Sequence, residues 1–242
     1  MKILWYLTVL LLFAGSVSAQ AKKAAPAGKK SSTTSKSKRS VKKATGKTEF
    51  DELICYEDGP CTFSIHKGDT LVYDVNAAGK LYSLFVIPNK FDAAALADFN
   101  WLTSAPDSKK GHVTINAKAL KSSKRYMNIL PSGDLKLSDA TCFWFCADNF
   151  SEITKKPTSV TLDNNAPETF SSPDDDAVSM NVNYKGKDIS LDGFAIQSKP
   201  EGEPGRKEIW ILNISSNLLI IKMDIGWTME LKEVRAKKII KK

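Results

Sequence analysis

Four cysteines are the residues whose type and spacing most suggest chemistry in this chain of 242 residues: Cys55, Cys61, Cys142 and Cys146. An even number of cysteines favours disulfide bonds in an exported protein. The turn sequence EDGP between Cys55 and Cys61 could fold these two together, and we expect that bridge. If residues 142–146 are extended, the last two cysteines lie about 13 Å apart, beyond the reach of a disulfide. If the chain bends, a local loop becomes possible, so their partners stay open.

A metal site or a redox-active pair is the alternative chemistry for these cysteines. Three residues separate Cys142 from Cys146, and His66 or the other two cysteines could complete a ligand set. Zinc sites and redox pairs more commonly use a Cys-x-x-Cys spacing, and an oxidising compartment works against free thiolates. We therefore expect structural disulfides and no cofactor.

Histidine catalysis has little support in the sequence. His66 and His112 are the two histidines of the chain, and each stands at the end of a predicted strand, where a surface imidazole is common. Neither a Gly-x-Ser-x-Gly nucleophile motif nor a glycine-rich phosphate loop accompanies them. We nominate no catalytic residue from these motifs.

Carboxylates suggest two further hypotheses. A glycosidase needs only two suitably placed carboxyl groups, and four aspartates lie near predicted strand ends: Asp69, Asp74, Asp98 and Asp192. The acidic run at 174–176 suggests calcium, but an EF-hand loop would need Gly and Glu at its sixth and twelfth positions. Counted from Asp174, those positions hold Ser179 and Lys185. We therefore interpret the run as solvated loop charge.

The aromatic run Phe143-Trp144-Phe145 is the other conspicuous cluster. Successive side chains of a strand point to opposite faces, so the run could present a ligand-stacking surface. We favour the simpler interpretation that one side is core and the other is a covered surface.

The elements that must position these residues are most clearly patterned near the carboxyl end. Trp227, Met229 and Leu231 alternate with polar residues, which is the period of a strand with one buried face. The runs at 209–214 and 219–223 are apolar, and turn sequences follow both. Residues 207–235 are therefore predicted to form a three-stranded antiparallel meander.

Short strand-like runs recur through the rest of the body, at 62–66, 70–75, 80–87, 97–103, 111–116, 159–162, 178–184 and 189–197. Pro88 is expected to end one of them. Two helices are predicted at 118–126 and 148–153, the second with Asp148 as its N-cap. This rhythm predicts an all-β fold, an antiparallel β-sandwich that is one large unit or two small consecutive ones, with one or two short helices. The two β-rich halves would be 49–156 and 157–235.

The amino terminus has the features of an export signal. Lys2 precedes an apolar stretch at 3–14, and Val17-Ser18-Ala19 matches a cleavage site. The apolar stretch is shorter than the ~20 residues of a membrane helix. We expect residues 1–19 to be a signal peptide. The protein would then be exported to the periplasm, the outer membrane or the exterior, with no transmembrane helix.

Residues 20–48 are rich in Lys, Ala and Ser and contain no acidic residue. Such a composition buries too little apolar surface to order itself, so we expect a disordered arm. The arm either contacts an anionic envelope surface or another polyanion, at about 1 kcal/mol per basic residue near a membrane, or is a simple spacer. Its candidate contact residues are Lys22, Lys23, Lys29, Lys30, Lys36, Lys38, Arg39, Lys42, Lys43 and Lys47.

The formal net charge of +8 divides unevenly along the chain. Of the 35 basic residues, one is in the signal peptide, ten are in the arm and five lie from Arg235 onward. Residues 49–234 contain the other 19 basic residues and all 27 acidic residues. The body at 49–234 therefore carries a net charge of −8. It is flanked by two basic segments, the arm at 20–48 and the tail at 236–242. Specific nucleic-acid recognition is not expected, because it needs a basic patch interleaved with aromatic residues.

The segments GDTLVYDVNAAGKLYSLFV and LLIIKMDIGWTMELKEV resemble those of exported β-rich proteins of Gram-negative bacteria with no known activity. The resemblance extends over most of residues 55–235. It implies export and a β architecture, and it transfers no catalytic or binding residue.

Three functions are compatible with these features. The preferred hypothesis is a non-enzymatic envelope or secreted protein with a structural or binding role, because no nucleophile, base and orienting group occur together in a recognisable motif. The alternatives are an envelope glycan or ester hydrolase that uses paired carboxylates, and a calcium- or carbohydrate-binding module.

Overall fold

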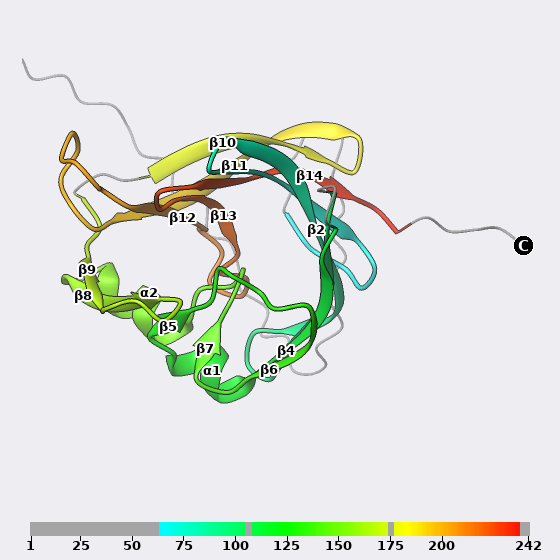
Figure 1. Ribbon diagram of the computed structural model, residues 1–242, viewed down its shortest axis with the longest axis horizontal. Coiled ribbons are helices and arrows are strands. Elements are labelled where there is room, and N and C mark those ends of the chain that lie inside the picture. Colours follow the sequence, from blue (N-terminus) through cyan, green and yellow to red (C-terminus); the bar gives the residue numbers. More distant parts are fainter. Residues whose placement is uncertain (1–62, 105–107, 174–176, 238–242) are drawn as a thin grey trace, which may run out of the picture. The chain divides into compact units, whose positions relative to one another are not determined.

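The alternating runs of the body form one ten-stranded sheet and one four-stranded sheet (Figure 1). The computed structural model describes residues 63–104, 108–173 and 177–237. The predicted signal peptide and arm, Cys55, Cys61, the acidic run at 174–176 and the tail from 238 lie outside these residues. The prediction of a chain dominated by strands, with short helices, is confirmed.

The large sheet has the strand order β10-β11-β12-β13-β14-β1-β2-β3-β4-β6. In chain order its strands are β1 (Thr70–Ala77), β2 (Lys80–Asp92), β3 (Leu96–Thr103), β4 (Lys110–Asn116), β6 (Gly133–Leu137), β10 (Ala177–Tyr184), β11 (Lys187–Gln197), β12 (Glu208–Leu212), β13 (Ile220–Asp224) and β14 (Thr228–Arg235). The predicted meander near the carboxyl end is β12-β13-β14.

Strands β10 to β14 close into a five-stranded barrel because one edge of β14 has two partners. The start of β14, from Thr228 to Glu230, pairs antiparallel with β13. Since β13 has only five residues, the rest of that edge is open to another strand. There Glu233 and Val234 pair in parallel with the end of β10.

The predicted sandwich is not confirmed in that form. Two sheets packed face to face would leave β10 as a free edge with unpaired backbone groups. Pairing the end of β10 with β14 satisfies the backbone groups of Asn183 and Tyr184 and shortens the free edge, which is the advantage of closing a sheet.

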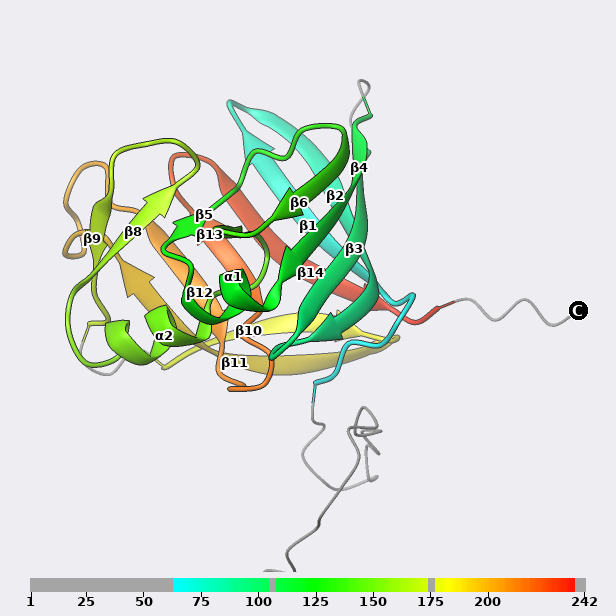
Figure 2. The same cartoon turned by 90° about the horizontal axis from the view of Figure 1, so that it is seen from below.

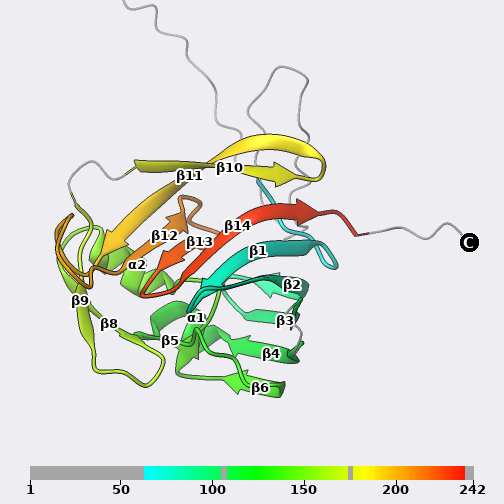
Figure 3. The same cartoon turned by 45° about the horizontal axis from the view of Figure 1, so that its top comes forward.

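The second edge of β14 extends the sheet beyond the barrel. Strand β1 pairs with β14 along its whole length, β2, β3 and β4 follow as antiparallel neighbours, and β6 adds in parallel to β4. Figure 3 shows β14, β1, β2, β3, β4 and β6 one beneath the next. Strands from both predicted halves therefore share one sheet.

A small sheet and two helices complete the described part of the chain. The sheet order is β7-β5-β8-β9, with β5 (Arg125–Tyr126), β7 (Ala140–Thr141), β8 (Thr158–Leu162) and β9 (Glu168–Phe170). The helices are α1 (Ala117–Ser122) and α2 (Ala147–Ile153). Figure 2 shows α2 beside β8. In the described residues, no helix has the length and apolar character needed to cross a membrane.

Both helices differ in detail from their predicted forms. Helix α1 ends at Ser122, because Ser123 is already extended and leads into β5. The prediction of Asp148 as the N-cap of α2 is wrong. Cys146 caps this helix, with its sulfur accepting the Asn149 N–H at 3.4 Å, and Asp148 lies in the first turn.

Two strand predictions also differ. Strand β2 continues past Pro88 to Asp92, because the pairing with β3 shifts between Pro88 and Lys90. A bulge of this kind accommodates a proline, which has no N–H to donate. No strand forms at 63–66, although Phe63 and Ile65 are buried.

A single apolar core lies beneath the large sheet and includes residues of the small sheet and of the loop at 142–145. Tyr73 and Tyr126, both almost fully buried, anchor it with their hydroxyl groups. Tyr73 donates to the Ile220 carbonyl at 3.0 Å, and Tyr126 accepts the Cys146 N–H at 2.9 Å. Both tyrosine hydroxyls therefore have a partner, as their burial requires.

Candidate functional site

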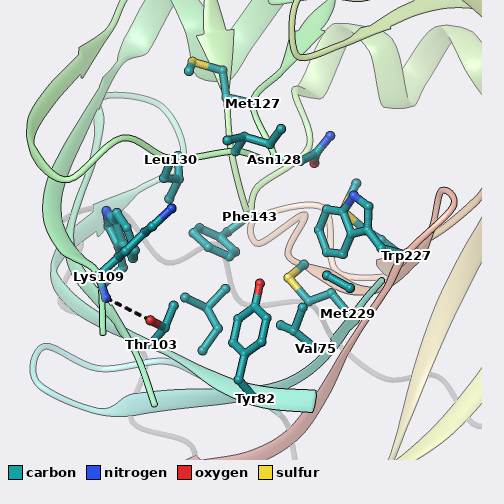
Figure 4. Close-up of a pocket in the computed structure, with 15 residues that line it drawn as sticks. Val75, Tyr82, Thr103, Lys109, Met127, Asn128, Leu130, Phe143, Trp227 and Met229 are labelled. Atoms are coloured by element: carbon teal, nitrogen blue, oxygen red, sulfur yellow. Dashed lines mark hydrogen bonds between the residues drawn. The ribbon is translucent and has the colours of Figure 1, made fainter. Parts of the chain in front are cut away.

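A pocket of about 280 Å³ lies on the inner side of the large sheet (Figure 4). Its floor comes from β1, β2 and β3, one side comes from β13 and β14, and the segment at 127–130 after β5 covers it. The strand period explains the floor, because Val75 and Tyr82 lie directly opposite each other and both face inward.

The lining is mostly aromatic and aliphatic. Tyr82, Trp101, Phe143 and Trp227 supply four aromatic rings. Figure 4 shows the Tyr82 hydroxyl directed into the space between Phe143 and Met229. Burial raises the pKa of Tyr82, so its hydroxyl keeps its proton at neutral pH and can donate a hydrogen bond to a bound molecule.

Three of the chain's five methionines line the pocket. Met223 of β13 lies directly opposite Met229 of β14, and Met127 comes from the covering segment. Methionine is unbranched and polarisable, and it adapts to ligands of varied outline. The pocket is therefore built to contact apolar surface.

Phe143 forms the inner wall in a strained conformation. Its φ is 58°, and Trp144 N–H donates to the Cys142 carbonyl at 2.7 Å, so the chain makes a tight three-residue turn around it. A positive φ is unfavourable for a bulky residue. Backbone hydrogen bonds from Ile220 to Phe143 and from Phe145 to Leu218, both 2.7 Å, hold the turn in place.

Asp163 fixes the segment that covers the pocket. Its Oδ1 accepts the N–H groups of Asn128 at 2.7 Å and Ile129 at 3.0 Å, and its own N–H donates to the Tyr126 carbonyl at 2.7 Å. These bonds satisfy backbone groups that no strand pairs. The covering segment is thus positioned by a residue more than thirty positions away in the chain.

Lys109 is the charged residue among the described residues that line the pocket. It is exposed, and reciprocal hydrogen bonds with Thr103 hold its backbone: Lys109 N–H to Thr103 Oγ1 at 3.0 Å, and Thr103 N–H to the Lys109 carbonyl at 2.9 Å. Figure 4 shows its side chain extending toward the side of the pocket where Leu130 and Phe143 lie. Ile129 of the covering segment also lines the pocket and is 72% exposed.

The structure places two of the four candidate disulfide cysteines. Cys142 and Cys146 are buried free thiols. The chain bends at Phe143 and enters α2 after Cys146, so residues 142–146 are not an extended strand. Burial raises the pKa of both thiols, which makes them poor nucleophiles. The predicted bridge between Cys55 and Cys61 stays a prediction.

One polar cluster resembles a catalytic triad. Ser64 Oγ lies 3.5 Å from His66 Nε2, and His66 Nδ1 lies 3.5 Å from Asp69 Oδ2. Lys185 Nζ, however, is 3.0 Å from both Asp69 Oδ2 and His66 Nδ1.

Lys185 favours the histidine tautomer that cannot act as a base toward Ser64. An ammonium group donates, so His66 Nδ1 must accept and Nε2 carries the proton. Nε2 then faces Ser64 as a donor and cannot remove its proton, as a general base must. This cluster is better explained as a buried anchor for Asp69, which also accepts the His66 N–H at 2.9 Å.

The other predicted site residues are not brought together. Asp98 accepts from Asn89 at 2.7 Å and contacts His112 Nε2 at 3.2 Å on the outer face of the sheet, and Asp74 and Asp192 are exposed on other strands. In the part of the chain that the structure describes, no group of three or more His, Cys, Asp or Glu is arranged to hold a metal ion.

The aromatic run is divided among three environments, all buried. Phe143 lines the pocket, Trp144 stacks on Phe91 with ring centroids 4.9 Å apart, and Phe145 stacks on Tyr126 at 4.5 Å. The run is therefore core, as favoured from the sequence, with one ring available to a ligand. Sequence analysis missed Lys109 and Asp163, because neither belongs to a motif and only the fold gives them their roles.

No protein-family model, curated protein or solved structure matches this chain. Its function therefore has to be inferred from the geometry of the pocket.

Proposed function

We propose that this protein is an exported, non-enzymatic binding protein that holds a small apolar ligand in the pocket between β1–β3, β13–β14 and the segment at 127–130. The observation that carries this proposal is the pocket itself, with about 280 Å³ of space and a lining of four aromatic rings and three methionines. A concave, mostly apolar site with a few polar groups is the usual form of a small-molecule site.

The size and lining favour an apolar ligand over a sugar. A cavity of about 150 Å³ is known to accept one benzene molecule, so this pocket suits a body about twice as large. The many hydroxyl groups of a sugar would each need a partner, and burying them without one is unfavourable. Nine of the fifteen lining residues have no side-chain group that forms strong hydrogen bonds.

Binding without catalysis is proposed because the pocket brings together no nucleophile, base and orienting group among the described residues. In the cluster of Ser64, His66 and Asp69, Lys185 Nζ lies 3.0 Å from His66 Nδ1, which favours the tautomer whose Nε2 cannot take a proton from Ser64. Export is supported by the basic, apolar and small-residue pattern of residues 1–19.

The test is a fluorescence titration of the full chain with 2-naphthol, a neutral ligand of ten carbon atoms. Saturable binding is expected, with a change in tryptophan emission because Trp101 and Trp227 line the pocket. Ala77→Phe should fill the space and weaken binding at least tenfold, since Ala77 lies in the lining.

Ala93→Phe is the matched control, because Ala93 is exposed in the turn between β2 and β3. It should bind 2-naphthol like the wild type. Absence of saturable binding, or equal weakening by both variants, would show that this pocket is not a ligand site.

A further inference from the structure

The pocket has a charge opposite to that of the body around it. Residues 49–234 carry a formal charge of −8, yet the described residues that line the pocket include one lysine and no carboxylate. A purely apolar ligand would need no charged group at this position. An acidic body would also repel an anion everywhere except near such a local positive charge.

The position of this lysine is set by the fold. Lys109 stands just before β4, and its two hydrogen bonds with Thr103 of β3 close the end of that strand pair. Its backbone is therefore fixed, while its side chain extends to the pocket side on which Leu130 and Phe143 lie (Figure 4). An ammonium group carried from a fixed backbone position at the margin of an apolar pocket is suited to the charged end of an amphiphile.

A second polar group is available inside the pocket. The Tyr82 hydroxyl points into the space, and it stays protonated at neutral pH, since burial raises its pKa. A protonated phenol donates a hydrogen bond to an anionic oxygen. Tyr82 and Lys109 thus present two donors, while the methionines and Phe143 present apolar surface.

We propose that the natural ligand is an anionic amphiphile: a carboxylate with an apolar body of roughly ten to twelve carbon atoms, the size set by the benzene comparison. Its apolar body lies against Met223, Met229 and Phe143, and its anionic end pairs with Lys109. This inference rests on the proposed binding function and adds the ligand's class and the residue that selects it.

The test compares two ligands that share a naphthalene body and differ in charge at pH 7, 2-naphthoate and 2-naphthol. The full chain should bind the carboxylate about three to five times more tightly, the size expected for a partly exposed ion pair. In about 1 M NaCl the preference should shrink, because the Debye length falls to about 3 Å.

Lys109→Gln should remove the preference, so that both ligands bind with the dissociation constant of 2-naphthol. Lys110→Gln is the matched control, because Lys110 is the neighbouring exposed lysine and does not line the pocket. It should keep the preference.

The two proposals fail in different ways. If both ligands bind the wild type equally, the anionic ligand class is wrong while the apolar pocket stands. If Lys109→Gln keeps the preference, Lys109 is not the residue that selects the anionic end. If neither ligand binds, the proposed binding function itself is wrong.

Discussion

Phe143 shows how a single residue can be held in an unfavourable conformation where a ligand would bind. A non-glycine residue at φ 58° costs of the order of 1–3 kcal/mol. The surrounding contacts offset this, because its ring packs on Tyr73 and Phe99, with centroid distances of 5.7 and 5.5 Å. The turn aims the ring at the pocket while Trp144 and Phe145 enter the core.

At the same scale, the buried cysteines give a prediction about thiol reactivity. Burial raises the pKa of Cys142 and Cys146, and the thiolate is the reactive form. A native sample should therefore show almost no thiol that reacts with an aromatic disulfide reagent at pH 8. After unfolding in guanidinium without reductant, two thiols per chain should react, since Cys55 and Cys61 are predicted to be bonded.

The double variant Cys142→Ser, Cys146→Ser should show no reactive thiol after the same unfolding. Four reactive thiols in the wild type would exclude the predicted bridge between Cys55 and Cys61. Absence of any reactive thiol in the unfolded wild type would mean that Cys142 and Cys146 are bonded as well.

At the scale of elements, the covering segment at 127–130 depends on one carboxylate from the turn after β8. Asp163 adopts φ 55°, and its side chain satisfies two backbone N–H groups of the segment. Asparagine tolerates this conformation and keeps one acceptor oxygen, whereas alanine keeps neither advantage.

Asp163→Ala is expected to loosen the covering segment and weaken 2-naphthol binding several-fold. Hydrogen bonds to a charged acceptor contribute about 1.5–3 kcal/mol each, so hydrogen exchange at Asn128 and Ile129 should accelerate clearly. Asp163→Asn should have a smaller effect on both measurements.

Asp188→Ala serves as the control, because Asp188 accepts a side-chain hydrogen bond from Asn183 at an exposed position of β11, far along the chain. Its exchange rates at 127–130 should match the wild type. Unchanged exchange in Asp163→Ala would contradict the role given to this carboxylate.

At the scale of the whole molecule, charge separates the chain into a basic arm and an acidic body. Residues 20–48 contain ten basic residues, whereas residues 49–234 carry a net charge of −8. Anionic surfaces would attract the first and repel the second, and both forces weaken with salt. The arm is therefore the part of the chain that we propose to contact an anionic envelope surface.

Deletion of residues 20–48 is expected to abolish sedimentation of the protein with phosphatidylglycerol vesicles at about 20 mM salt. The form that retains the arm should sediment with these vesicles and be released at about 0.5 M NaCl, where screening is strong. Vesicles of neutral phosphatidylcholine should retain neither form.

A variant with the ten basic residues of the arm replaced by Gln separates charge from length. It should behave like the deletion. Equal sedimentation of all three forms would leave the arm with no role beyond that of a spacer.

Most of the strands were predictable because their signal is local. Alternation at Trp227, Met229 and Leu231 places these residues on one face wherever the strand lies, and β14 begins one residue after the first of them. The extension of β2 past Pro88 was not predictable, because the bulge depends on pairing with β3. The N-cap at Cys146 was not predictable either, because Ser, Thr, Asp and Asn are the residues preferred at this position.

The sequence by itself determined the all-β class, the order of most strands along the chain, the meander near the carboxyl end and the division of charge, since each follows from residue type and short-range spacing. Only the tertiary structure decided the closure of β10 on β14, the pocket and the partners of Lys109 and Asp163. These features join residues far apart in the chain, such as Val75 with Met229 and Asn128 with Asp163. Local periodicity predicts which face of a strand a side chain occupies. The residues that this face contacts depend on how distant strands pack together.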